Sequence, residues 1–500
     1  GHLLARQTRK WVEQSGFDWC KTRANTFVEH LIKIRSGEQT EQPSWLSPKY
    51  MVYAERIAKS GKDAQFIQLI QCWRVYTLLG KAKVRLSEAD VEKFVTAVHG
   101  SSPDSSEWRT KPLVRGRSAE IGLIDYNRLL GEIGFTARWP GGNDVKWRRS
   151  LFRTWTNVGP LQSPHKLPNL LSLEGSLFEQ WVAGINYVPS LSRGGRAIPK
   201  PHVLSVYDGM PQNLWLTQHR PDGTCGNVHY RIQSDGKARF FCAPQFWVQY
   251  LLEPYSKELY RALRRIGQDC TFDQNAGVRK VTEWIQSGKT CHSIDLSSAT
   301  DRFPLAFTYD FLDGISTTPN LRMWASAFAH LSRLPFGFRG EGLPVGTPWV
   351  RWNVGQPLGF NASFAAFALS HHALVQLAFA PVIGEIDGDL PYVILGDDIV
   401  IAHDRAAENY RRLLRGLGVA VSENKSVSSD SLGEFAGRVI LREDFGFKLK
   451  HTRADLRTLL SSIENIGPKA IRLLPKSTLR DVIALIPSGS HPGYNPGGFP

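Results

Sequence analysis

Residues 392–402 read Tyr-Val-Ile-Leu-Gly-Asp-Asp-Ile-Val-Ile-Ala, two short apolar runs on either side of a Gly-Asp-Asp tip. The runs predict a tight hairpin whose tip carries two neighbouring acids, Asp397 and Asp398. Two carboxylates about 4 Å apart repel by roughly 4 kcal/mol at an effective dielectric near 20, and a nearby cation relieves that repulsion. The pattern favours a divalent-metal site, although Gly and Asp are also common turn residues and the tip alone allows a plain turn.

Another acid lies upstream, at the end of a second short segment. Residues 290–294, Thr-Cys-His-Ser-Ile, are typical of a strand, Asp295 ends it, and Asp301 follows shortly after. An acid-ended strand beside an acid-tipped hairpin makes a carboxylate cluster. Mg²⁺ prefers oxygen ligands and usually takes one or two protein carboxylates plus substrate phosphates. Two such ions hold the attacking and leaving oxygens of a phosphoryl transfer in line.

A glycine-bearing loop and an apolar helix separate these acids along the chain. Residues 355–363 read Gly-Gln-Pro-Leu-Gly-Phe-Asn-Ala-Ser, and the Ala- and Leu-rich residues 364–375 predict a helix. Such a loop approaches a nucleotide closely because glycine has no side chain; a simple helix entry is the alternative. Residues 404–417 predict another helix, which Gly418 ends, and Lys425 lies in the turn that follows.

This ordered series resembles the palm motifs of viral RNA-dependent RNA polymerases, and it is most similar to those of the mitovirus, narnavirus and ourmiavirus group. The matching segments are 295–304, 355–372, 393–401, and 425–426 followed by 434–438. The resemblance implies an α+β fold, a right-hand polymerase with fingers, palm and thumb and a ferredoxin-like palm sheet flanked by helices. It also implies the replication of a viral positive-strand RNA genome by two-metal-ion nucleotidyl transfer.

The implied domains follow the order of the motifs. They are an N-terminal region and fingers (1–290), a palm in two parts (291–304 and 355–445), a fingers insertion (305–354), a thumb (446–486) and a flexible tail (487–500).

The resemblance also implies catalytic roles. Asp295 and Asp397 would be metal ligands, and Asp398 would be an adjacent, more peripheral one. Lys425 is a candidate general acid that protonates the leaving pyrophosphate. The implied cofactor is a pair of Mg²⁺ ions, with Mn²⁺ as a possible substitute.

The same resemblance implies a nucleotide-binding set. Lys237 and Arg239 would grip the triphosphate, and a solvated basic strand is the alternative for them. Asp301 would lie near the ribose, and Gly359 and Ser363 match the loop glycine and hydroxyl of the second palm motif.

One position departs from the pattern of many positive-strand polymerases. They place an Asn four residues after that hydroxyl, where it reads the ribose, and this chain has Phe367 there. Ribose selection would then rest on other groups, such as Asp301 and Ser363.

Composition agrees with a nucleic-acid partner. The 61 basic and 46 acidic residues give a formal charge of +15, which favours a phosphate-bearing partner and a salt-sensitive contact. The expected partners are an RNA template, its product duplex and nucleoside triphosphates. The six scattered cysteines lack a Cys-x-x-Cys pair, which argues against a zinc module and a disulfide framework.

Two rival functions share some of these features. A reverse transcriptase has the same acid-bearing strands, but its first motif usually carries an aromatic ring that blocks a 2′-hydroxyl, whereas Thr300 and Asp301 are polar. A non-enzymatic basic RNA-binding protein would not require clustered acids.

Residues 352–384 contain no Asp, Glu, Lys or Arg, but their polar residues favour a buried loop and helix over a membrane span. His371 and His372 are neighbours on this helix and point about 100° apart, so packing and hydrogen bonding suit them better than a shared metal ion. The expected location is inside the host cell, in the mitochondrion or the cytoplasm.

Overall fold

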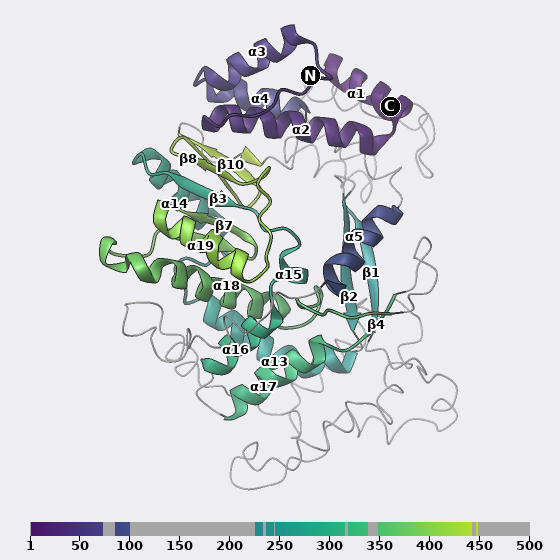
Figure 1. Ribbon diagram of the computed structural model, residues 1–500, viewed down its shortest axis with the longest axis vertical. Helices are drawn as coiled ribbons and strands as arrows, with labels where there is room; N and C mark the ends of the chain where they lie inside the picture. The colour runs from purple at the N-terminus through teal and green to yellow at the C-terminus, as the bar shows by residue number, and fades with distance from the viewer. Residues whose placement is uncertain are drawn as a thin grey trace, which may run out of the picture.

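The computed structural model describes residues 2–73, 86–100, 226–233, 237–244, 246–315, 319–338, 349–442 and 447–448. Helices and small sheets alternate along these segments, which confirms the predicted α+β class (Figure 1). The predicted thumb, apart from residues 447–448, and the predicted tail lie outside the described residues.

A four-stranded antiparallel sheet carries the predicted hairpin. Its order is β6-β7-β3-β8, and the strands are β3 (Cys291–Ile294), β6 (Tyr392–Leu395), β7 (Asp398–Ile401) and β8 (Val427–Ser429). β6 and β7 pair across the turn, and β3 pairs with the other side of β7, with Ile294 opposite Ile399. Both the predicted hairpin and the predicted strand before Asp295 are confirmed, and they are direct neighbours.

Apolar side chains cover both faces of this central sheet. Ile399 and Ile401 of β7 pack with α18 (Ser363–Phe379) and α19 (Asp404–Gly416), whereas Val400 packs with α14 (Gln274–Gln286). The alternation follows from the two-residue period of a strand. Figure 1 shows α18 and α19 beside β7, and α14 close to β3. A sheet buried on both faces explains why both runs of the hairpin are continuously apolar.

The charge-free segment forms α18 and the short 3₁₀ helix η4 (Ala380–Glu385). Residues 363–385 are long and apolar enough to cross a membrane, but 78% of the apolar window is buried inside the protein. α18 packs on the central sheet and on two further helices, α13 (Phe246–Leu263) and α16 (Leu305–Gly314). It is therefore a core helix, as the sequence predicts.

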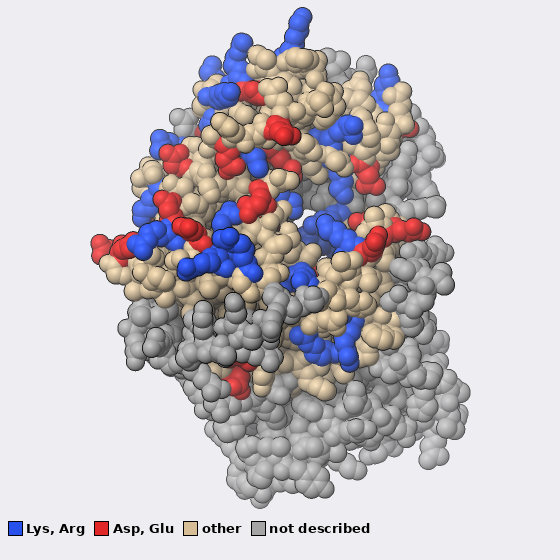
Figure 2. All heavy atoms as spheres, viewed as in Figure 1, with Lys and Arg blue, Asp and Glu red and all other residues tan. Residues whose placement is uncertain are grey.

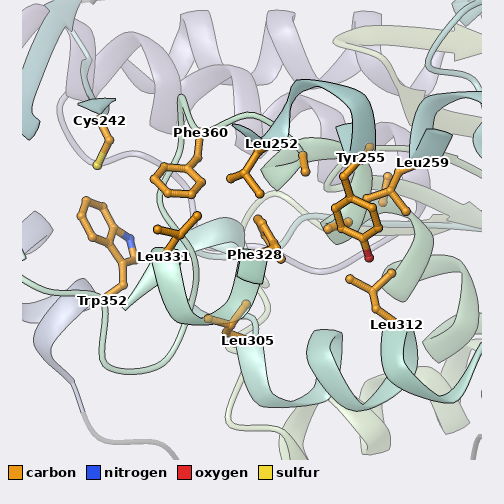
Figure 3. Packing of buried hydrophobic residues seen from close by; sticks show 14 of the residues in the cluster. Cys242, Leu252, Tyr255, Leu259, Leu305, Leu312, Phe328, Leu331, Trp352 and Phe360 are labelled. Atoms are coloured by element: carbon orange, nitrogen blue, oxygen red, sulfur yellow. The ribbon is translucent and has the colours of Figure 1, made fainter. Parts of the chain in front are cut away.

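A second four-stranded sheet holds the basic strand. Its order is β2-β1-β4-β5, with β1 (Gly226–Ile232), β2 (Ala238–Pro244), β4 (Phe336–Phe338) and β5 (Trp349–Val350). It shares one large apolar cluster with α13, α16, α17 (Pro319–Ser332) and α5 (Glu88–His99). Figure 3 shows Cys242, Trp352 and Phe360 in this cluster. Residues of α18 also belong to it, so the cluster joins the second sheet to the central one.

The N-terminal helices lie over the far end of the central sheet (Figure 1). They are α1 (His2–Ser15), α2 (Phe17–Ser36), α3 (Pro48–Lys59) and α4 (Asp63–Trp73). Their apolar cluster includes Val427 of β8 and side chains of a small sheet formed by β9 (Leu432–Phe435), β10 (Arg438–Leu441) and β11 (Phe447–Lys448). This packing anchors the N-terminal helices to the sheet that carries the acids.

Candidate active site

The acid-tipped turn and the end of β3 lie at one edge of the central sheet. Because Ile294 pairs with Ile399, the adjoining residues Asp295 and Asp398 occupy neighbouring positions on antiparallel strands. Asp397 is exposed, and the Asp295 side chain is 32% exposed. Both carboxylates therefore reach solvent, from which a cation can approach.

His371 of α18 supports the turn from behind. Its Nδ1 lies 2.7 Å from the Gly396 carbonyl oxygen, and its Nε2 lies 2.5 Å from the Tyr410 hydroxyl of α19. Burial lowers the pKa of His371 to about 4, so the ring is neutral near pH 7. A neutral ring donates from Nδ1 to the carbonyl and accepts from Tyr410 at Nε2. The predicted hydrogen-bonding role of His371 is confirmed.

His372 ties α18 to the segment beside β6. Its Nε2 lies 3.1 Å from Asp269 Oδ2, and its Nδ1 lies 3.1 Å from the Tyr392 hydroxyl. The side chains of His372 and Asp269 have no exposed surface. Asp269 also forms a backbone bridge with Ile394 of β6. This buried network fixes the strand that leads into the acid-tipped turn.

Lys425 contacts the acid at the end of β3. Its Nζ lies 3.2 Å from Asp295 Oδ2, and the backbone N–H of Asp295 donates to Ser426 Oγ at 3.1 Å. The structure thus brings together two residues that are far apart in the sequence. A lysine at this distance offsets the negative charge of the carboxylate, and its use as a general acid stays a prediction.

The described residues contain no group of three acidic, His or Cys side chains placed to share one metal ion. Asp295, Asp397 and Asp398 meet at one sheet edge without forming a closed three-ligand cage. Mg²⁺ needs no such cage, because waters and substrate phosphates fill most of its six positions. The oxygen donors at this edge fit Mg²⁺, and the role of Asp398 as a third ligand stays a prediction.

Asp301 lies in the short helix α15 (Ala299–Arg302). Its Oδ1 accepts a hydrogen bond from Trp352 Nε1–H at 2.9 Å. Burial raises the pKa of Asp301 to about 6, against the opposing effects of the Trp352 hydrogen bond and the positive charge of Arg239. Arg239 belongs to β2, so this electrostatic interaction connects the predicted finger strand to an acid of the predicted palm.

The glycine-bearing loop is held against β2. The Cys242 N–H of β2 donates to the Leu358 carbonyl at 2.6 Å. Arg239 lies on the same strand, Lys237 comes directly before it, and both are exposed. The two predicted triphosphate-binding residues therefore lie on, or directly before, the strand that is hydrogen-bonded to the loop.

Gln249 of α13 holds the same loop through three hydrogen bonds. Its Nε2 donates to the Gly359 carbonyl at 2.7 Å, its Oε1 accepts from the Asn361 N–H at 2.6 Å, and its own carbonyl accepts from Asn361 Nδ2 at 2.5 Å. Gly359 itself is exposed. The loop is thus fixed at its base while its glycine stays accessible to a ligand.

Ser363 begins α18 and is only 1% exposed. Its hydroxyl accepts from Gln356 Nε2 at 3.0 Å. The hydroxyl therefore accepts one hydrogen bond within the protein and keeps its own O–H donor and a second lone pair, and its contact with a nucleotide stays a prediction.

Replacing Gly359 with alanine is expected to displace the loop. Gly359 has φ +94°, and a Cβ there would lie 2.4 Å from the Cys242 carbonyl oxygen. Backbone strain of this kind costs about 1–3 kcal/mol, so we expect the free energy of unfolding to fall by about 2 kcal/mol, with reduced nucleotide incorporation. Urea unfolding measures the first effect. Gly416→Ala is the matched control, because a Cβ there meets nothing within 4 Å; equal stabilities of the two variants would contradict the strain.

One face of the molecule carries many basic side chains. Figure 2 shows Lys and Arg side chains, with some Asp and Glu side chains among them, around a hollow in the middle of this face. With a formal charge of +15 for the whole chain, such a surface attracts a polyanion.

Three residues of the site are absent from the sequence predictions. Trp352, Asp269 and Gln249 each act through a partner that is distant in sequence: the pairs are Trp352–Asp301, Asp269–His372 and Gln249–Gly359. No local pattern marks such pairs. The position of Trp352 just before the glycine-bearing loop is the one signal that points to its role.

A family model described as mitovirus RNA-dependent RNA polymerase matches residues 186–488 of the chain. The chain is 32% identical over 272 residues to the RNA-directed RNA polymerase of Cryphonectria parasitica mitovirus 1, a match that covers 51% of the chain and 32% of that polymerase. The chain thus spans about a third of the length of this relative.

Two further comparisons concern a plant protein and a solved structure. The chain is 34% identical over 232 residues to an uncharacterised mitochondrial protein of Arabidopsis thaliana, covering 44% of the chain and 86% of that protein. A crystal structure of an insertion-loop deletion mutant of a human picobirnavirus RNA-dependent RNA polymerase aligns with a TM-score of 0.40 at 14% identity, over 79% of the chain and 91% of that structure.

Proposed function

The chain belongs to the mitovirus RNA-dependent RNA polymerase family, and on this premise we propose that it is an RNA-directed RNA polymerase. It joins nucleoside triphosphates on an RNA template. The observation that carries the proposal is the register of β3 and β7, which brings Asp295 to the Gly-Asp-Asp turn. A plain turn would not require an acid from a second strand at the same edge.

In this proposal Asp295 and Asp397 hold two Mg²⁺ ions, with Asp398 as the peripheral ligand and Mn²⁺ as a substitute. The ions supply electrostatic stabilisation of the charge that develops on the attacked phosphate and the leaving pyrophosphate. Lys425 stays next to Asp295 and donates a proton to the leaving group. A positioned general acid typically contributes about 10²–10⁴-fold to the rate.

The nucleotide lies against the exposed surface that β2 and the glycine-bearing loop form together. Lys237 and Arg239 neutralise the triphosphate oxygens, Arg239 as a fork and Lys237 as a point charge. Gly359 allows close approach of the backbone to the nucleotide, and Ser363 lies at the end of the same loop. Asp301, beside Arg239, faces the ribose.

The template is a positive-strand viral RNA genome, and the product duplex is the other macromolecular partner. The net charge of +15 supports a phosphate-rich partner. The plant relative is named as a mitochondrial protein. This favours the mitochondrion over the cytoplasm as the compartment of the chain.

The proposed activity is tested by incubating the purified chain with a single-stranded RNA template, Mg²⁺ and labelled nucleotides. We expect a product whose sequence follows the template and which forms from ribonucleotides. Efficient use of deoxyribonucleotides instead would identify a reverse transcriptase. If the chain binds the template but incorporates no nucleotide in the presence of Mg²⁺ or Mn²⁺, it is a non-enzymatic RNA-binding protein. This result would contradict the proposal.

The preference for ribonucleotides is expected to depend on pH. Burial raises the pKa of Asp301 to about 6, so the carboxylate takes up a proton as the pH falls through that value. A neutral acid makes weaker hydrogen bonds than a carboxylate, by about 1 kcal/mol. The ratio of ribonucleotide to deoxyribonucleotide incorporation should therefore fall roughly fivefold between about pH 7.5 and pH 5.5. Asp301→Asn is the control, because its ratio should be low and independent of pH; a pH-independent ratio in the wild-type chain would contradict this role.

A further inference from the structure

The hydrogen bond from Trp352 to Asp301 connects a core side chain to the acid that the proposed function places beside the ribose. Trp352 is 1% exposed, and its ring packs against Phe94 and Phe336, with centroid distances of 5.7 and 5.8 Å. The indole has one donor, Nε1–H, and it points at Asp301 Oδ1 over 2.9 Å. The packing leaves the ring no freedom to turn away.

The backbone fastens the same two segments together. The Gly355 N–H donates to the Asp301 carbonyl at 3.1 Å, and the Gln356 N–H donates to the Thr300 carbonyl at 2.8 Å. A Cβ on Gly355 would lie 2.2 Å from the Thr300 carbonyl oxygen, so only glycine permits this approach. The Asp301 backbone is therefore fixed. The hydrogen bond from the Trp352 indole then fixes the orientation of the Asp301 carboxylate.

One carboxylate oxygen remains available. Among the residues that the structure describes, no hydrogen bond reaches Asp301 Oδ2. A ribose 2′-hydroxyl is a donor that a carboxylate oxygen accepts, and a deoxyribose offers nothing there. A site with a buried acceptor discriminates strongly against a substrate that leaves it unpaired.

Two other side chains near the loop and α18, Ser363 and Phe367, are each only 1% exposed. The Ser363 hydroxyl accepts from Gln356, and Phe367 is an apolar ring packed against Phe303. Phe367 has no acceptor to offer, and the Ser363 oxygen is covered. Selection for ribose then depends on how firmly Asp301 is held.

We propose that Trp352 is a positioning residue for ribose selection: its Nε1–H holds Asp301 Oδ1, so that Oδ2 accepts a hydrogen bond from the 2′-hydroxyl of the incoming nucleotide. The inference rests on the proposed polymerase function. Trp352 itself touches neither the nucleotide nor the metal ligands.

The test compares kcat/KM for one ribonucleotide and its deoxy counterpart, opposite the same template base, in the wild-type chain and in Trp352→Phe. We expect the ribose preference to fall about tenfold, because an unanchored carboxylate loses most of one charge-assisted hydrogen bond. Deoxyribonucleotide incorporation should change less than ribonucleotide incorporation. A purely structural effect would lower both alike and leave the ratio unchanged.

Trp324→Phe is the matched control, because Trp324 is also 1% exposed and belongs to the same apolar cluster. Its ribose preference should equal that of the wild type. In an Asp301→Ala background, Trp352→Phe should change the ratio no further, because the residue that it positions is gone.

A folded Trp352→Phe variant that keeps the wild-type ratio would overturn the inference while leaving the polymerase function intact. If that variant does not fold, replacement of Trp352 by 3-benzothienylalanine, which keeps the ring shape but lacks the N–H, gives the same test, and an unchanged ratio is again the contradicting result. If the wild-type chain incorporates no ribonucleotide, the proposed function and this inference both fail.

Discussion

Replacing Asp397 with asparagine is expected to lower template-directed nucleotide incorporation by about 10³-fold or more. Asparagine has nearly the same shape as aspartate but carries no charge, so it is a poor ligand for Mg²⁺. Asp397 is exposed at the tip of the turn, and the turn is held by the His371 hydrogen bond to Gly396. The variant should therefore fold like the wild type, and the loss should be catalytic.

Single-nucleotide incorporation under saturating template and Mg²⁺ measures this effect. Asp389→Asn is the matched control, because Asp389 is an exposed acid in the loop that leads into β6. It should incorporate nucleotides at the wild-type rate. Full activity of Asp397→Asn would show that Asp397 is not a metal ligand and would contradict a metal site at the hairpin.

Replacing Asp269 with alanine is expected to cause the largest loss of stability, about 3–5 kcal/mol in the free energy of unfolding. Asp269 Oδ2 accepts from His372 Nε2, and Asp269 Oδ1 accepts from the Thr271 N–H at 2.9 Å. Both side chains of the Asp269–His372 pair lack exposed surface, so water cannot replace the missing partner. Breaking a buried polar pair by removing one member leaves the other desolvated and unpaired.

Chemical denaturation followed by circular dichroism measures this loss. Asp273→Ala is the control nearby: Asp273 caps the N-terminus of α14 by accepting from two backbone N–H groups, and loss of such a cap costs about 1 kcal/mol. A loss for Asp269→Ala no greater than that of Asp273→Ala would contradict the importance of the buried pair.

The sequence predicts the elements that present the acids, because their patterns are local. The apolar runs around Gly396 form β6 and β7, the strand before Asp295 forms β3, and the segment from Asp404 forms a helix that ends just before Gly418. Each of these signals lies within a single element. A continuous apolar run in a strand also indicates burial on both faces, and the helices on both sides of the sheet agree with that.

The contacts that hold the site in place are not local. Trp352 and Asp301 meet across 51 positions, and His372 and Asp269 across 103. No periodicity in the sequence marks such pairs. Taken alone, each of these residues is equally well explained as an ordinary core side chain or turn residue. The packing of the N-terminal helices on β8, β9 and β10 is equally long-range; for example, the Ser428 N–H donates to Glu38 Oε1 at 3.3 Å.

The measurement that tests the central claim most directly is single-nucleotide incorporation by four proteins side by side: wild type, Asp295→Asn, Asp397→Asn and the double variant. If both acids hold the same ions, each single variant loses about 10³-fold or more, and the double variant is no slower than the slower single variant, because residues that act as one unit are not additive. A wild-type rate in either single variant, or losses that multiply in the double variant, would contradict a shared metal site at the β3 and β7 edge.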